Sequence, residues 1–194
     1  MERHGEQDAW AVRSLLAGVA EHTPLSMSVE EYGWVYRLAR DSEPPFLDIG
    51  THYGLSALVM SRARPGARIL TIDNMADFGN DKEGAMREDC GRLVRGEKNV
   101  VTIIGESRHL VPIATASHNF GLALIDGSHW ASDVAADVDS CRGVPTVLVH
   151  DALDEGPARA LEGYRHRILP AEKIKAGWDI EPRGLALIEK GEKQ

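Results

Sequence analysis

The sequence predicts an α/β fold, in which a doubly wound, mostly parallel sheet of about seven strands is preceded by N-terminal helices. Strand-like and helical segments alternate from residue 46 to about residue 165, a pattern typical of parallel sheets with crossover helices. The strand-like segments are short apolar runs without polar alternation, which indicates burial on both faces. With 194 residues, of which 43% are hydrophobic and 27% charged, the chain is expected to form a single domain, 1–194.

The first 44 residues are expected to be a helical cover, and residues 45–194 the sheet-bearing core. Residues 6–20 carry apolar side chains at helical spacing. A second helix is predicted to begin at a capping box, with Ser28 as N-cap and Glu31 three residues later, and to end before Pro44. These helices are expected to cover one edge of the sheet. The alternative is that they form a lid or the surface of a homodimer.

The predicted elements of the core follow one another with short connections. Strands are expected at 46–49, 67–73, 99–104, 121–125 and 146–149, with two more around 167–169 and 184–189. Helices are expected at 55–62, 81–95, 107–115, 130–141 and 157–164.

Polar side chains follow most of these strands at the point where each strand ends. In parallel sheets, ligands bind outside the carboxyl ends of the strands. The side chains at these ends are therefore expected to gather into one site: Asp48, Asp73, Glu106, Ser107, Asp126, His129, His150 and Asp151.

A glycine loop, residues 50–54, joins the first core strand to the next helix. Gly50 and Gly54 are spaced GxxxG, and glycine lets the backbone turn sharply and approach a ligand. The alternative is a close packing contact between strand and helix. Asp73, which lies 19 residues after Gly54, is predicted to accept the hydroxyls of a ribose. Glu106 and Ser107 stand where an adenine edge would lie, although they also fit an ordinary helix start.

Composition excludes several classes of function. A net charge of −8 and a pI near 5.5 argue against a broad nucleic-acid-binding face. No apolar run approaches the roughly 20 residues needed to span a membrane, and the N-terminus lacks a signal-peptide core, so a cytoplasmic location is expected. The two cysteines, Cys90 and Cys141, are expected to be free thiols.

Together these motifs resemble those of the class I S-adenosylmethionine-dependent methyltransferases. Residues 48–56, DIGTHYGLS, are similar to the first motif of that family, and Asp73 matches its ribose-binding acid. The segment 125–130, IDGSHW, with Val134 and Asp137 after it, is similar to the IDGxH signature of a branch of small metal-dependent O-methyltransferases that act on sugar or macrolide-sugar hydroxyls. The resemblance implies a Rossmann-like fold that binds S-adenosylmethionine through Asp48, Gly50, Thr51, Tyr53, Gly54, Ser56, Asp73, Glu106, Ser107 and Asp126.

The resemblance also implies a mechanism. A divalent ion would lower the pKa of an acceptor hydroxyl, and Mg²⁺ suits hard oxygen ligands. Asp126 and Asp151 are the expected ligands, with His150, Asp154 or water as the third where the family has an acid. The alternative for His150 is a buried histidine at the end of its strand. His129 stands at the position of the family's catalytic histidine and is expected to be the general base. The alternative for His129 is a role in capping the next helix.

The predicted function is therefore transfer of a methyl group to a hydroxyl of a small molecule, with a sugar favoured. The first alternative is a catalytically idle regulatory subunit that binds S-adenosylmethionine. A second is an NAD-dependent oxidoreductase, which the absence of GxGxxG disfavours. Trp130, next to the expected base, is predicted to stack on the adenine, to line the acceptor cleft or to pack in the core.

Overall fold

The computed structural model describes residues 2–19, 23, 25–75, 89–171 and 182–189, and side chains from residue 10 onward. The predicted helix 81–95 falls mostly outside the described residues. Its described part, residues 89–95, consists mainly of turns. The other predicted helices and all seven predicted strands are present, with ends that differ by a few residues.

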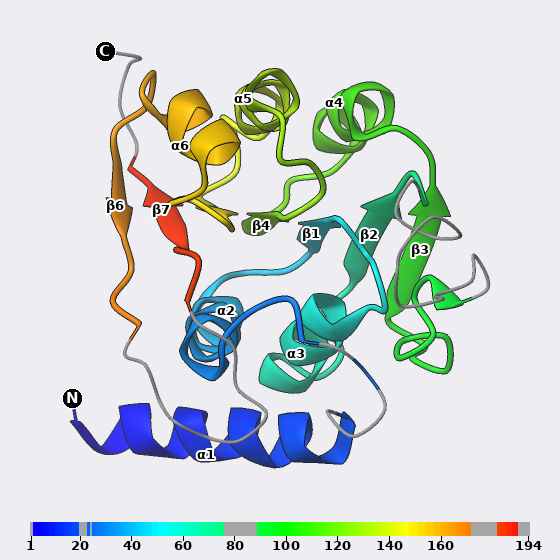
Figure 1. Ribbon diagram of the computed structural model, residues 1–194. Coiled ribbons are helices and arrows are strands. Elements are labelled where there is room, and N and C mark those ends of the chain that lie inside the picture. Colours follow the sequence, from blue (N-terminus) through cyan, green and yellow to red (C-terminus); the bar gives the residue numbers. More distant parts are fainter. Residues whose placement is uncertain (1, 20–22, 24, 76–88, 172–181, 190–194) are drawn as a thin grey trace.

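Seven strands form one sheet in the order β3-β2-β1-β4-β5-β7-β6 (Figure 1). Neighbouring strands among β1 to β5 pair in parallel, and β7 is antiparallel to both β5 and β6. The chain runs outward from β1 to β3 and then returns to place β4 on the other side of β1, which makes the β1–β4 border the topological switch point. The strand bounds are β1 Phe46–Ile49, β2 Ile69–Asp73, β3 Val100–Ile104, β4 Leu122–Ile125, β5 Thr146–Val149, β6 His166–Ile168 and β7 Ala186–Ile188.

Helices cover both faces of the sheet, which confirms the doubly wound prediction (Figure 1). One face carries α2 (Val29–Asp41) and α3 (Leu55–Ala63), with α1 (Glu2–Val19) packed outside them. The opposite face carries α4 (Ser107–Ser117), α5 (Ala131–Ser140) and α6 (Glu155–Leu161). None of the helices within the described residues is long and apolar enough to cross a bilayer.

Two apolar clusters, one on each face, hold these layers together. The first joins α1, α2 and α3 to the sheet and includes the fully buried Leu16 and Tyr32. The second joins α4, α5 and α6 to the other face. Cys141 belongs to this second cluster, and both it and Cys90 are free thiols, as predicted.

Burial on both faces holds for the central strands but not for β3. Every residue of β1 and β4 is buried. In β3, Val101 is 57% exposed and Ile104 is 50% exposed. The prediction was wrong for this strand because β3 lies at the edge of the sheet and, among the described strands, pairs with β2 alone. An apolar run alone does not distinguish an edge strand from a central one.

Candidate active site

The glycine loop lies at the switch point, directly against the loop that follows β4. Gly50 has a φ of +99°, and a Cβ placed there would lie 2.2 Å from the carbonyl oxygen of Asp126. Gly54, with a φ of +90°, packs against Val94, whose Cγ2 would lie 2.8 Å from an added Cβ. Only glycine tolerates this combination of left-handed backbone and close approach. Each glycine thus meets a packing demand, in addition to any role in binding a ligand.

Asp48 lies beneath this loop, inside β1. It is fully buried and accepts a hydrogen bond from Thr71 Oγ1 at 2.7 Å. Burial raises the pKa of Asp48 to about 7, although hydrogen bonds from Thr71 and Ser56 oppose the rise. Its Oδ1 has no hydrogen-bond partner among the described residues. Contacts of Asp48 and Ser56 with the cofactor remain predictions. Both side chains are buried and support the loop from below.

The two other loop residues predicted to bind the cofactor are also buried. Thr51 Oγ1 lies 2.6 Å from Thr71 Oγ1, so that Asp48, Thr71 and Thr51 form one chain of hydrogen bonds. The Tyr53 ring lies under the Arg92 guanidinium, with 4.6 Å between Arg92 Cζ and the ring centroid. These contacts fix the shape of the loop from below.

Asp73, at the end of β2, binds the loop through its carboxylate. The backbone N–H of His52 donates to Oδ2 at 2.8 Å, and that of Met75 donates to Oδ1 at 2.6 Å. With respect to the described part of the chain, each oxygen thus has one donor and a second lone pair. The structure thus places the predicted ribose-binding acid beside the glycine loop.

The residues after β3 divide between surface and interior. Glu106 is exposed, with the side-chain amide of Asn74 3.5 Å away. Ser107 begins α4 and donates from Oγ to Asp137 Oδ2 at 3.1 Å. Burial raises the pKa of Asp137 to about 6. Ser107 therefore links α4 to α5, and contacts of Glu106 and Ser107 with an adenine remain predictions.

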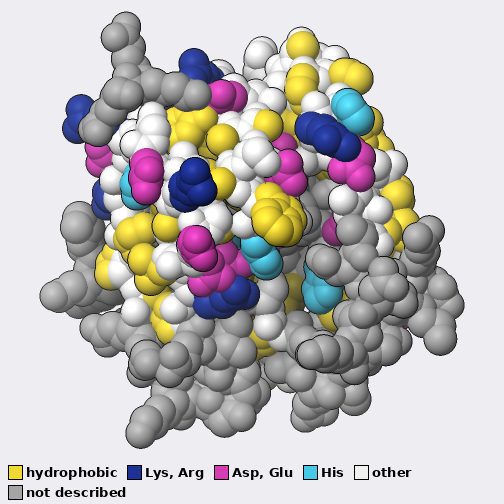
Figure 2. Space-filling view, turned by 45° about the horizontal axis from the view of Figure 1, so that its top comes forward, with side chains coloured by type: hydrophobic (Ala, Val, Ile, Leu, Met, Phe, Trp, Pro, Cys, Tyr) yellow, Lys and Arg dark blue, Asp and Glu magenta, His cyan; other side chains and the backbone are white. Residues whose placement is uncertain are grey.

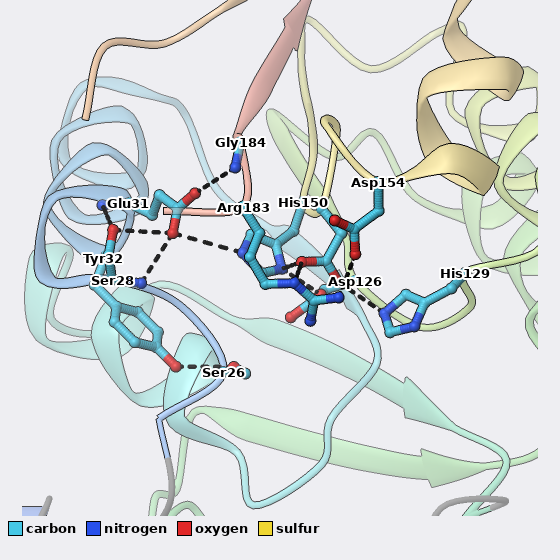
Figure 3. A network of polar contacts seen from close by, with 11 residues as sticks. Ser26, Ser28, Glu31, Tyr32, Asp126, His129, His150, Asp154, Arg183 and Gly184 are labelled. Atoms are coloured by element: carbon cyan, nitrogen blue, oxygen red, sulfur yellow. Dashed lines mark hydrogen bonds and ion pairs between the residues drawn. The ribbon is translucent and has the colours of Figure 1, made fainter. Parts of the chain in front are cut away.

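The ends of β4 and β5 bring together Asp126, His129 and Asp151 (Figure 3). His129 Nε2 lies 2.7 Å from Asp151 Oδ2. The hydrogen bond to Asp151 raises the pKa of His129 above its usual value. The His129 side chain is 59% exposed, whereas Asp151 is buried. An exposed imidazole held by a buried carboxylate is the arrangement of an oriented general base.

His150 lies below the His129–Asp151 pair, where it contacts the carboxylates of Asp126 and Asp151. Its Nδ1 is 2.8 Å from Asp126 Oδ1 and 3.2 Å from Asp151 Oδ1. Burial alone would lower the pKa of His150, but the carboxylates of Asp126, Glu31 and Asp151 outweigh it and raise the pKa to about 10. These carboxylates thus favour the protonated form of His150.

Whether a divalent ion fits this cluster depends on which ligand atoms are not already in contact with other side chains. Asp126, His129 and Asp151 each offer one ligand atom, and these atoms lie within 4.8 Å of one another. Oδ2 of Asp151 contacts His129, whereas Oδ1 lies at ion-pair distance from Arg183 Nε, 3.2 Å, and has no hydrogen-bond partner among the described residues. His150 Nδ1 faces the same carboxylates. Arg183 and His150 would therefore compete with an ion for the oxygens of Asp126 and Asp151, and binding of Mg²⁺ at this cluster remains a prediction.

Sequence reasoning missed two members of this cluster, Glu31 and Arg183. The sequence identifies Glu31 only as half of a capping box, which is present as predicted. Arg183 comes just before β7, contacts Asp151 and forms an ion pair with Asp154. No local signal in the sequence marks Arg183.

Exposed apolar side chains stand beside the base. Trp130, next to His129, is 75% exposed, and Leu153, two residues after Asp151, is exposed as well. Figure 2 shows histidine, acidic and basic side chains gathered around a large hydrophobic one on this face. The prediction that Trp130 packs in the core was wrong, because Trp130 stands at the N-cap of α5, outside the buried face of that helix.

Comparison with solved structures shows the same fold elsewhere. A protein from Staphylococcus aureus described as a caffeoyl-CoA O-methyltransferase has a TM-score of 0.62 and 15% identity, over 92% of this chain and 91% of that one. An S-adenosylhomocysteine-bound methyltransferase from Podospora anserina has a TM-score of 0.59 and 17% identity, over 94% and 88%. The calicheamicin methyltransferase CalS11 has a TM-score of 0.56 and 15% identity, over 93% and 92%. These likenesses show the fold, which is Rossmann-like as predicted.

Sequence comparison adds a relative and a family. A rat (Rattus norvegicus) protein named transmembrane O-methyltransferase homolog is 32% identical over 90 residues, which are 45% of this chain. The match spans 33%, about a third, of the rat protein's length. A family model described as a methyltransferase domain matches residues 47–152, from β1 through β5 to the residue after Asp151. The chain therefore belongs to this methyltransferase family.

Proposed function

We propose that this protein transfers the methyl group of S-adenosylmethionine to a hydroxyl of a small molecule, with a sugar or glycoside as the favoured acceptor. The observation that carries the proposal is the His129–Asp151 pair, 2.7 Å apart, at the strand ends next to the glycine loop. Membership of a methyltransferase family supports the cofactor. Two proteins of the same fold are named for small molecules, caffeoyl-CoA and calicheamicin.

The reaction follows from the orientation of His129. When neutral His129 donates its Nε2–H to Asp151, its Nδ1 is free to accept a proton. The acceptor oxygen attacks the methyl carbon in line as the carbon–sulfur bond breaks, the hydroxyl proton passes to Nδ1, and S-adenosylhomocysteine leaves. Asp151 then stabilises the imidazolium, which is the role of the buried acid in other histidine–carboxylate pairs.

The cofactor is proposed to lie along the glycine loop, with its ribose at Asp73. The Asp73 carboxylate supports this placement, because among the described residues one backbone donor occupies one position on each oxygen. Trp130 is proposed to pack against an apolar face of the acceptor, since a large aromatic ring exposed beside a reactive group is typical of a ligand contact.

No step of this mechanism passes through a metal ion. The magnesium predicted from the sequence would be held by Asp126 and Asp151 and would lower the pKa of the acceptor hydroxyl, but Arg183 and His150 oppose it. The cytoplasmic location and the homodimer likewise remain predictions.

The first test is cofactor binding, measured by calorimetry with S-adenosylmethionine and with NAD. We expect binding of S-adenosylmethionine alone. Binding of NAD without S-adenosylmethionine would contradict the proposal and favour the oxidoreductase.

The second test is turnover of a panel of sugars, glycosides and phenols, followed as release of S-adenosylhomocysteine. His129→Ala is expected to lower kcat by roughly 10²- to 10⁴-fold, because it removes the base. His166→Ala, at an exposed position on the edge strand β6, is the control and should retain activity. Full activity with His129→Ala would contradict the mechanism, and cofactor binding without turnover of any acceptor would favour the regulatory subunit. Turnover in excess EDTA tests the predicted ion. Loss of turnover that Mg²⁺ restores would support a metal at Asp126 and Asp151, and unchanged turnover would remove it from the reaction.

A further inference from the structure

Helix α2 reaches the candidate active site through Glu31 (Figure 3). The Glu31 side chain is fully buried. Its Oε2 accepts hydrogen bonds from Ser28 N and Ser28 Oγ, both at 2.9 Å. Its Oε1 accepts from the backbone N–H of Gly184 at 2.9 Å, 153 residues further along the chain. One carboxylate therefore ties the start of α2 to the segment that carries Arg183.

The same carboxylate faces His150. The distance from Glu31 Oε2 to His150 Nε2 is 3.7 Å, an ion-pair contact. The other ring nitrogen of His150, Nδ1, faces Asp126 and Asp151. The imidazole thus faces Glu31 with one nitrogen, at ion-pair rather than hydrogen-bond distance, and presents the other to the two carboxylates at the ends of β4 and β5.

A capping box does not by itself explain this placement. The box requires only that Glu31 accept from the backbone of Ser28, and a solvent-exposed glutamate can do that. Burying a carboxylate costs free energy unless hydrogen bonds and an opposite charge compensate for it. Here Gly184 supplies an additional hydrogen bond, and the His150 imidazole lies 3.7 Å from Oε2.

We infer that Glu31 is a positioning residue of the methyl-transfer site, which orients the His150 imidazole and, through it, Asp126 and Asp151. The inference rests on the proposed function, because Asp151 in turn holds the base His129. It makes the N-terminal helices part of the site, in addition to their role as a cover.

The test compares Glu31→Gln with Ser28→Ala. Glutamine has a single side-chain oxygen, so it cannot accept from both Ser28 and Gly184 and carries no charge toward His150. Ser28→Ala weakens the same helix cap but keeps the carboxylate beside His150. Glu31→Asp, which keeps the charge but withdraws it by one methylene, serves as a second variant if the amide does not fold. The readouts are imidazole ¹H–¹⁵N spectra at one fixed pH, urea unfolding, S-adenosylhomocysteine binding and initial rates.

We expect Glu31→Gln to shift the imidazole signals of His150 and His129 and to lower kcat by roughly ten- to a hundredfold, as small displacements of catalytic groups do. Its KM for S-adenosylmethionine should stay unchanged. Glu31→Asp should change the spectra and kcat in the same direction, and Ser28→Ala should retain wild-type spectra and kcat.

Two results would overturn the inference: unchanged imidazole signals in Glu31→Gln, or an equal loss of kcat in Ser28→Ala. The spectra require neither cofactor nor acceptor. Failure of the wild-type protein to bind S-adenosylhomocysteine would therefore count against the proposed function, while the spectra would still test the role of Glu31 toward His150.

Discussion

Asp151 is the residue on which the candidate site converges. Its two oxygens contact His129, His150 and Arg183, and its φ of +54° is unusual for a residue other than glycine. Burial alone would raise the pKa of Asp151, but the hydrogen bond from His129 and the charges of His150 and Arg183 lower it. Asp151 is thus a carboxylate that stays ionised and can hold His129 through a reaction cycle.

The pKa of Asp48 is raised, whereas that of Asp151 is lowered, and this gives a prediction on how stability depends on pH. Burial raises its pKa from 3.8 to about 7 in the folded protein. Between these pH values the folded state binds more protons than the unfolded state, so the free energy of unfolding falls as the pH rises. Asp48→Asn should abolish this contribution, which is on the order of a few kcal/mol between pH 4 and pH 8.

Urea unfolding gives the free energy of unfolding at pH 5 and at pH 8. The effect of Asp48 is the difference between the wild type and the variant in how much this free energy changes between the two pH values. Asp48→Asn should lose less stability than the wild type between the two pH values. Asp41→Asn, which changes an exposed aspartate paired with Arg40, is the control and should behave like the wild type. Identical pH dependence in all three proteins would show that Asp48 does not titrate in this range.

At the scale of elements, α6 sets the position of the base through Gly156. A Cβ at Gly156 would lie 1.8 Å from the carbonyl oxygen of His129, so the first turn of α6 packs directly against the loop that carries His129. Alanine there should push the two apart and cost about 1–3 kcal/mol of stability. It should also lower kcat by more than the loss of stability explains, while S-adenosylhomocysteine binding is retained.

Gly163→Ala is the matched control, since nothing lies within 4 Å of a Cβ at that glycine. Thermal unfolding, calorimetry and initial rates compare the two variants. A wild-type kcat in Gly156→Ala would mean that a shift of the His129 loop does not affect the reaction. It would contradict the prediction that α6 sets the position of the base.

At the scale of the whole molecule, the N-terminal helices pack on the same core as the sheet. Leu16 of α1 is fully buried in the cluster that contains α2, α3 and residues of β1 and β4. Leu16→Ala should lower the free energy of unfolding by about 2–5 kcal/mol, because it leaves a cavity in this core. Unfolding should remain a single cooperative transition.

Far-UV circular dichroism and tryptophan fluorescence in urea test this directly. Ser14→Ala, at an exposed position of the same helix, should leave stability within about 0.5 kcal/mol of the wild type. Two separate transitions, or an unchanged midpoint for Leu16→Ala, would mean that α1 folds independently of the sheet.

Local pattern determined most of the fold. The apolar runs, the capping box at Ser28, the glycine loop and the alternation of elements each depend on residues close in the sequence. The strands and helices they predict are present, apart from the helix expected at 81–95. Asp126, His129 and Asp151 could also be predicted to converge, because parallel strands place their carboxyl ends along one edge of the sheet.

Tertiary structure alone decided the remaining features. Glu31 is buried because Gly184 and His150, far along the chain, complete its contacts, and Arg183 reaches Asp151 only because β7 inserts between β5 and β6. β3 is exposed because of its place at the sheet edge, which an apolar sequence does not encode. Short-range pattern fixes which elements form, whereas burial and charge pairing depend on which distant segments meet.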